Sequence, residues 1–213
     1  MGLARAAVLA LLALASCGAF AQGAYPAKPV RIIVTFTTGG AADIGARYIA
    51  NGITGPLGQR VIVENRPGAG GALAGQHMAA NIKPDGYTVA QLPLGVFRLP
   101  HMANTKFNPV TDLTWILNIA GYQFGTSVRA DAPWKTWQEF LAFAKANPDK
   151  IAYGTPGSLT SLHITMEEIA YREGLQWLHV PFKGNADATQ ALLGGHVTAS
   201  ADSTGGVCRG GNV

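Results

Sequence analysis

Charged residues are scarce in this chain of 213 residues, because Asp, Glu, Lys and Arg make up only 13% of it. Long polar tracts are missing too, and 48% of the residues are hydrophobic, which argues against intrinsic disorder. Basic residues are scattered singly, so we expect no nucleic-acid partner. The net charge of +4 modestly favours anionic ligands. The length suffices for one large domain or two small ones.

No apolar stretch is long enough to span a membrane, which takes about 20 residues. The N-terminus instead has the parts of a secretory signal peptide: Arg5, the apolar segment Ala6–Ala15 and the small-residue site Ala19-Phe20-Ala21. We therefore expect residues 1–21 to be a signal peptide. The alternative is a lipoprotein signal, Leu14-Ala15-Ser16-Cys17. Either signal predicts export.

Cysteine is also scarce, with two residues in the whole chain. Removal of the signal peptide takes away Cys17 and leaves Cys208. A disulfide within the mature chain is therefore not expected.

After residue 21, the sequence alternates between strand and helix patterns. We expect extended segments at residues 30–36, 61–64, 87–92, 113–119, 123–128, 151–153, 178–181 and 197–201. We expect helices at residues 41–57, from the 67–71 loop to about 80, from Pro133 to the Asn147-Pro148 stop, at 161–172 and at 187–193. This alternation predicts an α/β fold with mainly parallel sheets.

A boundary between two units is expected near residues 121–125. Residues 22–122 would then form a first lobe and residues 123–202 a second. In open α/β sheets, ligands bind beyond the carboxyl ends of the strands, in a crevice between units. Residues 203–213 have no periodicity, and we expect them to form an irregular tail.

The most informative segment is the turn Thr37-Thr38-Gly39-Gly40, which joins an apolar strand to a helix. Its glycines allow positive φ and close approach of a ligand, and the start of the helix carries a partial positive charge. This arrangement suits a small anion. Asp43 lies in the first helical turn, where its charge complements the helix dipole. Charge disfavours its contact with a ligand carboxylate, so it would order the loop or a water, or meet a ligand amino group.

A second strand–turn–helix unit repeats this pattern at residues 151–163. Thr155, Ser158, Thr160 and Ser161 are small hydroxyl residues that either cap the helix or bind an oxyanion. His163 would lie in the first helical turn, either as a ligand contact or as an ordinary core histidine.

Motifs for catalysis, metals and cofactors are weak. Ser158 and His163 could belong to a hydrolase triad, but no Gly-x-Ser-x-Gly elbow is present. His163 and Glu167 share a helix face, yet spacing places no further metal ligand. Residues 68–73 lack the third glycine of a dinucleotide fingerprint. We therefore expect a protein that is not an enzyme and has neither a metal nor a cofactor, with an exported hydrolase as a distant alternative.

Several motifs occur in a fixed order along the chain from Tyr25 to about Asp202. They are Tyr25-Pro26-x-x-Pro29-Val-Arg-Ile-Ile-Val34, Gly39-Gly40-x-x-Asp43-Ile-x-Ala-Arg47, Val63-Glu-Asn-Arg-Pro-Gly-Ala-Gly-Gly71, Pro84-Asp-Gly-Tyr-Thr88, Tyr153-Gly154 through His163, Val180-Pro-Phe-Lys-Gly184 and Leu193-Gly-Gly-His-Val197. In order and spacing, these motifs resemble those of the Bug family of periplasmic substrate-binding proteins, which are associated with tripartite tricarboxylate transporters.

This resemblance implies a two-lobed, Venus-flytrap protein of the type II periplasmic-binding-protein class, located in the periplasm. The implied ligand is a small organic anion such as a di- or tricarboxylate, an acidic amino acid or an aromatic acid. Membrane components of a tripartite tricarboxylate transporter are the implied partners. The implied binding residues are Phe36, Thr37, Thr38, Gly39, Gly40 and Asp43 from the first lobe, and Thr155, Gly157, Ser158, Ser161, His163, Lys183 and Asp202 from the second.

The sequence departs from the family pattern in two ways. Proline is usual in the family where Thr37 and Thr38 stand, so we expect a less rigid loop with more hydrogen-bond donors. Family chains are also substantially longer, so we expect a C-terminally truncated chain with an incomplete second lobe. A truncated product with no transport role is therefore the alternative to a functional receptor.

Overall fold

The computed structural model describes residues 25–203. The predicted signal peptide, with Cys17, and the predicted tail beyond Ser203, with Cys208, lie outside these residues. Among the helices of this part of the chain, none is long and apolar enough to cross a membrane.

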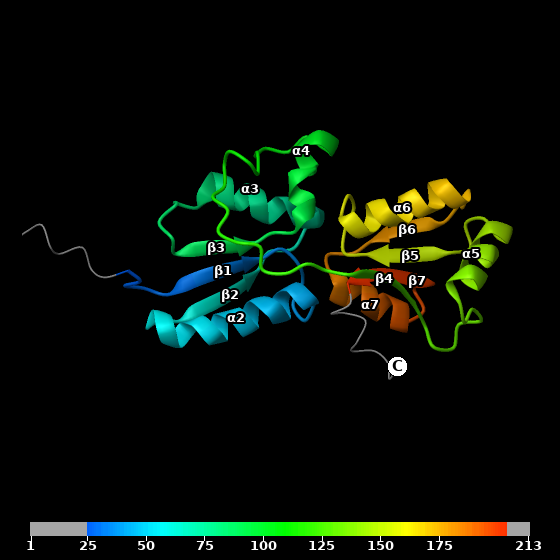
Figure 1. Cartoon of the computed structure of the whole chain (residues 1–213), viewed down its shortest axis with the longest axis horizontal. Coiled ribbons are helices and arrows are strands. Elements are labelled where there is room, and N and C mark those ends of the chain that lie inside the picture. Colours follow the sequence, from blue (N-terminus) through cyan, green and yellow to red (C-terminus); the bar gives the residue numbers. More distant parts are fainter. Residues whose placement is uncertain (1–24, 204–213) are drawn as a thin grey trace, which may run out of the picture.

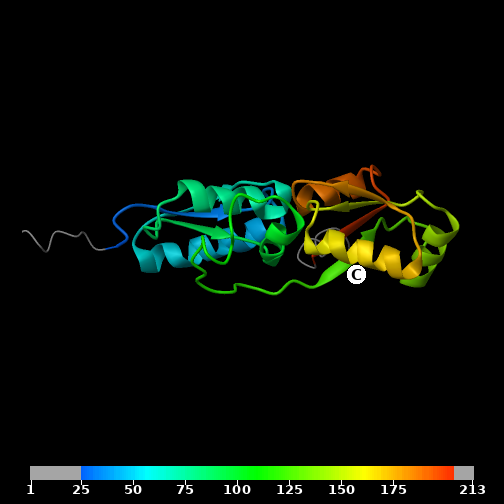
Figure 2. The same ribbon diagram turned by 90° about the horizontal axis from the view of Figure 1, so that it is seen from above.

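Two α/β units lie end to end (Figures 1 and 2). In the first unit, β1 (Val30–Val34), β2 (Val61–Asn65) and β3 (Thr88–Gln91) form a parallel sheet of order β2-β1-β3. The helical elements are α2 (Ala41–Leu57), η2 (Ala69–Gly71), α3 (Ala72–Asn81), η3 (Leu94–Phe97) and α4 (Leu99–Met102).

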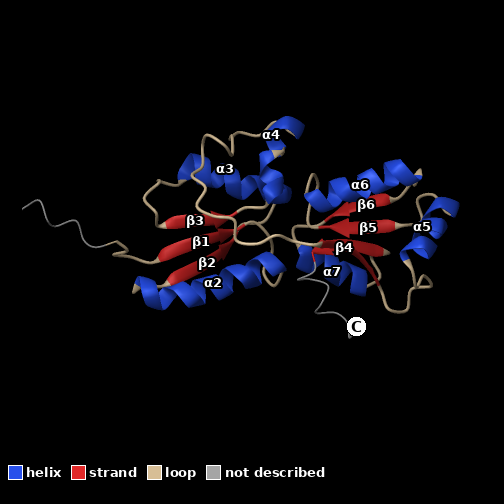
Figure 3. Cartoon of the chain, viewed as in Figure 1, coloured by secondary structure: helices blue, strands red, loops and turns tan. Residues whose placement is uncertain are grey.

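Helices α2 and α3 cover opposite sides of this sheet (Figure 3). The connection from β1 to β2 and the connection from β2 to β3 run in opposite directions along the sheet, so two right-handed crossovers place their helices on opposite faces. The buried alanines of α2, Ala42, Ala46 and Ala50, recur every four residues and form one core cluster with Ile32 and Val34 of β1.

The second unit contains a mixed sheet of order β4-β7-β5-β6. Its strands are β4 (Phe124–Val128), β5 (Ala152–Thr155), β6 (Leu178–Pro181) and β7 (Ala199–Ser203), and its helices are α5 (Trp137–Ala146), α6 (Ser161–Glu173) and α7 (Asn185–Leu193). One face packs against α5 and α6 through Phe140, Tyr153, Met166 and Trp177. On the other face, Gly154 leaves space for Ala188 of α7.

The structure confirms most of the predicted elements, including the helix at 41–57 and the strand at 178–181. The segment 113–119 is not a strand but part of an exposed connection between the units. Pro133 does not begin α5, because Thr136 caps this helix and accepts a hydrogen bond from the Glu139 N–H.

The predicted bounds of the last strand were also wrong. It spans Ala199–Ser203 instead of 197–201, so Ser203 belongs to a strand although the tail was expected to begin there. Strand β4 pairs with β7 in antiparallel orientation, so only part of the second sheet is parallel. The short elements η2, η3 and α4 were not predicted.

Candidate ligand-binding site

The carboxyl ends of the parallel strands meet at the junction of the two units. Figure 1 shows the arrows of β1 and β5 pointing toward each other across this junction. The loops that follow β1, β2, β5 and β6 are therefore gathered in one place, where open α/β sheets bind ligands.

Asp43 holds the first loop in shape. Its side chain is 2% exposed, and its carboxylate accepts hydrogen bonds from the Gly39 N–H (2.9 Å), the Asn65 amide (2.9 Å) and Arg47 Nε (3.0 Å). It also forms an ion pair with Arg47, whose Nη2 lies 2.9 Å from Asp43 Oδ1. Burial opposes ionisation, but the hydrogen bonds from Arg47, Gly39 and Asn65 prevail and lower the pKa of Asp43 below its usual value. Asp43 thus orders the loop, which is one of the roles considered from sequence.

Asn65 is a site residue that the sequence analysis did not single out. Its amide also donates to the Phe36 carbonyl (3.0 Å), and its side-chain oxygen accepts from Thr38 Oγ1 (3.1 Å) and Arg47 Nη2 (3.1 Å). It stands at the end of β2 directly opposite Val34 of β1. Its position at the end of an adjacent parallel strand was the sequence signal that could have identified it.

The first loop meets the start of α7 across the junction. A Cβ atom added to Gly184 would lie 2.2 Å from Thr37 Oγ1, and one added to Gly40 would lie 3.9 Å from the Ala186 nitrogen. Gly40 and Gly184 are the N-caps of α2 and α7, and neither helix start has a side-chain cap. Two helix N-termini with open backbone N–H groups therefore face each other.

Two buried hydroxyls at the end of β1 have no hydrogen-bond partner within residues 25–203. They are Thr35 Oγ1 and Thr37 Oγ1. An unsatisfied buried hydroxyl costs about 1–3 kcal/mol, so a ligand that accepts from Thr37 would recover free energy. Gly184 covers this oxygen, so the first loop and the start of α7 have to separate for a ligand to reach it.

The second loop is stabilised internally and touches the first unit elsewhere. Thr155 Oγ1 accepts from the Gly157 N–H (3.3 Å), and Thr160 Oγ1 donates to the Gly157 carbonyl (2.8 Å) and caps α6. Gly157 has a φ of 144°, which favours glycine, and its added Cβ would lie 3.2 Å from the Gly70 nitrogen. Thr155 and Gly157 thus shape the loop and bring it against η2.

His163 lies beneath this loop. Its Nδ1 accepts from the Leu159 N–H (3.1 Å), and its ring stacks on His179, with 3.9 Å between the centroids. His179 in turn forms a hydrogen bond to Thr155 Oγ1 (2.7 Å). Burial, together with the nearby His163, lowers the pKa of His179 to about 4.

His179 should make stability depend on pH. Unfolded histidine takes up a proton near pH 6.5, whereas His179 in the folded protein does so near pH 4, so stability falls as pH drops through this window. We expect this residue to lower the free energy of unfolding by about 2 kcal/mol at pH 5 relative to pH 8. Urea unfolding of wild type and His179→Gln at both pH values measures the difference. Equal pH dependence in the two proteins would contradict this assignment.

Ser158 and Ser161 lie at the start of α6. Ser158 is exposed, and no hydrogen bond joins it to His163 within the described residues, so the geometry does not assemble the hydrolase pair. Ser161 Oγ accepts from Arg98 Nη2 of the first unit (2.8 Å). Arg98, which sequence reasoning missed, thus bridges the two units.

The remaining two candidates differ in exposure. Lys183 is exposed just before the N-cap of α7. Asp202 is buried and accepts from Thr189 Oγ1 (3.1 Å), the Ser203 N–H (2.6 Å) and the Asn185 amide. Burial raises the pKa of Asp202 above its usual value, although these hydrogen bonds act in the opposite direction. Asp202 therefore joins the end of β7 to α7 through hydrogen bonds from Asn185 and Thr189.

Metal-binding geometry is absent from residues 25–203, where no three His, Cys, Asp or Glu side chains are grouped to hold an ion. Nε2 of His163 lies 3.9 Å from Glu167 Oε1, and Glu167 is engaged by the Tyr153 hydroxyl.

Comparisons of the sequence and of the structure with known proteins point to the same class of protein. The chain is 51% identical over 199 residues to the UPF0065 protein in the gbd 5′ region of Cupriavidus necator, covering 93% of this chain and 61% of that protein. The structure resembles periplasmic binding protein BugD (29% identity, TM-score 0.77, 87% of this chain and 62% of BugD). It also resembles R. palustris Rpa4515 with adipate (28% identity, TM-score 0.79, 84% and 60%).

The fold is therefore that of an α/β periplasmic binding protein, as predicted. Residues 45–208 match the family described as tripartite tricarboxylate transporter family receptor, TctC, and the chain belongs to this family. This match confirms the resemblance to the Bug family, whose members are receptors. The chain spans about 60% of the length of the relatives it matches.

Proposed function

We propose that this chain is a periplasmic solute receptor that binds a small organic carboxylate at the junction of its two units. The observation that carries the proposal is the meeting of two glycine-capped helix N-termini, at Gly40 and Gly184, beside the unpartnered hydroxyl of Thr37. Both helix ends present partial positive charge and free N–H groups to the same place, which favours an anion.

The charges around the first loop agree with this ligand. The Asp43 carboxylate is already saturated by Arg47, Asn65 and Gly39, so it presents little free negative charge to an incoming anion. The ligand site would therefore consist of the 37–40 turn, the start of α7 with Lys183, and the 155–163 loop. The solved relative titled with adipate binds a dicarboxylate, which is consistent with a carboxylate ligand here.

Delivery to a transporter is a separate part of the proposal. Members of the family are receptors of tripartite tricarboxylate transporters, so the membrane components of such a system are the proposed partners. The second candidate is a protein that binds the anion without delivering it. Co-purification with the transporter's membrane subunits, in the presence and absence of ligand, separates the two.

A thermal-shift screen against dicarboxylates, tricarboxylates, acidic amino acids and aromatic acids tests ligand binding. A carboxylate present at 100 times its dissociation constant should stabilise the folded protein by about 2.7 kcal/mol, a shift of several degrees. The corresponding amides, which lack the charge, are the control and should cause no shift. If the protein is folded by circular dichroism and none of the acids stabilises it, the proposed function is wrong.

A further inference from the structure

A cavity of about 280 Å³ opens at the junction, on the side of α3, α4 and α6. The first unit contributes Leu73, Leu99 and Phe107 to its lining, and the second contributes Ser158 and Leu159. The volume is just below the usual range for drug-sized ligands, so the cavity suits a small molecule. Because both units line it, an occupant would contact both.

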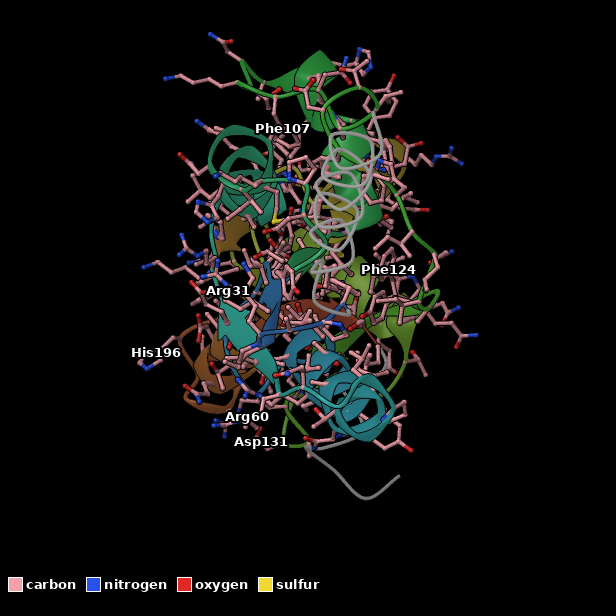
Figure 4. The ribbon with its side chains drawn as sticks, turned by 90° about the vertical axis from the view of Figure 1, so that its left-hand side faces the viewer. Arg31, Arg60, Phe107, Phe124, Asp131 and His196 are labelled. Atoms are coloured by element: carbon pink, nitrogen blue, oxygen red, sulfur yellow. The ribbon has the colours of Figure 1, made fainter. Side chains whose placement is uncertain are left out.

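The lining of this cavity suits the uncharged part of a ligand. None of the eleven described residues that line it is charged. Its polar members, Gln76, Asn104, Thr105 and Ser158, are neutral. Phe107, labelled in Figure 4, is buried and packs against Gly75 of α3. A carboxylate placed inside would lose its hydration without gaining a counter-charge.

A cation stands next to this cavity. Arg98 directly precedes the lining residue Leu99, and its Nη2 donates to Ser161 Oγ across the junction. Within residues 25–203, none of the ion pairs involves Arg98. Its guanidinium can therefore pair with an anion, for which its planar donors are well suited.

From this juxtaposition we propose that the ligand is an organic acid with an uncharged, largely apolar body that occupies the cavity, and that Arg98 adds its positive charge to that of the facing helix N-termini in attracting the carboxylate. This inference rests on the proposed function and narrows its ligand class from carboxylates in general. It disfavours tricarboxylates, because a second or third charge would fall in the uncharged cavity.

Calorimetric titration of the full chain with propanoate, butanoate, pentanoate, hexanoate and citrate tests the ligand class. Each added methylene should strengthen binding about fourfold, from about 0.8 kcal/mol per buried methylene, and citrate should bind at least tenfold more weakly than hexanoate. If the acids bind with no dependence on chain length, or if citrate binds most tightly, the cavity proposal is overturned while the proposed function stands. If a folded protein binds none of them or of the screened acids, the proposed function itself fails.

Matched variants locate the two parts of the ligand. Leu73→Gln should weaken hexanoate several-fold more than propanoate, whereas Leu94→Gln should change neither. Leu73 and Leu94 are both exposed, by 54% and 79%, but only Leu73 lines the cavity, and neither substitution threatens the core. Arg98→Gln should weaken all the monocarboxylates by a similar factor, about tenfold. Equal effects of Leu73→Gln and Leu94→Gln, or no effect of Arg98→Gln, would contradict the assignment.

Discussion

Replacing Asp43 with alanine should lower the free energy of unfolding by about 3 kcal/mol, the largest stability effect we expect at the site. The variant loses a buried carboxylate, leaves the Gly39 N–H without its acceptor, and removes one acceptor each from the Asn65 amide and the Arg47 guanidinium. The 37–40 turn would then lose the contacts that fix its backbone, so anion binding should weaken as well. Urea unfolding at pH 7 measures the first effect.

Asp187→Ala is the matched control for this prediction. Asp187 occupies the same place in α7 that Asp43 occupies in α2, in the first turn of a helix with a glycine N-cap. Its side chain is half-buried, and no hydrogen bond or ion pair within residues 25–203 involves it. Its loss removes only a favourable interaction with the helix dipole, so we expect a cost below about 1 kcal/mol. Equal destabilisation by the two variants would show that Asp43 acts only through the dipole.

Replacing Gly184 with valine should weaken carboxylate binding at least tenfold while the two units stay folded. Its Cβ would lie 2.2 Å from Thr37 Oγ1 and 2.8 Å from the Thr37 backbone nitrogen, so the first loop and the start of α7 would have to move apart. Gly184 has a φ of −179°, an extended conformation that valine adopts readily, so the variant acts through this contact and not through backbone strain. Displacements of about 1 Å suffice to disrupt precise ligand geometry.

Gly125→Val controls for the general effect of adding a branched side chain to a glycine in extended backbone. Gly125 is an exposed residue of β4, and a Cβ added there would meet no atom within 4 Å. Valine should be tolerated or mildly stabilising at this position. Calorimetric titration with the best acid from the thermal-shift screen compares the two variants. Unchanged affinity in Gly184→Val would mean that the ligand does not bind between Thr37 and α7.

Local patterns in the sequence predicted the fold well where one physical signal dominates. The apolar β-branched run before Thr37 predicted strand β1, and the helical pattern that follows the glycines predicted α2. The face of α2 that packs against the sheet, with Ala42, Ala46 and Ala50, was not predicted. The failures occurred where tertiary contacts decide. The apolar residues 113–119 fit a strand, yet they find no partner strand within residues 25–203 and remain a connection. The direction of β4 depends on its antiparallel pairing with β7, in which Phe124 lies opposite Ser203, 79 residues later in the chain. Local sequence carries no record of this pairing.

In the candidate site, too, local features could be predicted from sequence and tertiary contacts could not. The helix-start turns at Gly39–Gly40 and Gly157 were evident from sequence because glycine at such a turn has a specific conformational meaning. The partners that complete them, Asn65 and Arg98, were not, because their roles depend on which strands are adjacent and on how the two units meet. Ligand contacts by the predicted residues remain a proposal.

The most direct test is calorimetric titration of the purified chain, at low and high salt, with the acid that gives the largest thermal shift. We predict a single saturable site, weaker binding in Gly184→Val than in Gly125→Val, and no binding of the matching amide. A folded protein that binds no carboxylate, or that binds acid and amide equally, would contradict an anion site built from the two facing helix N-termini.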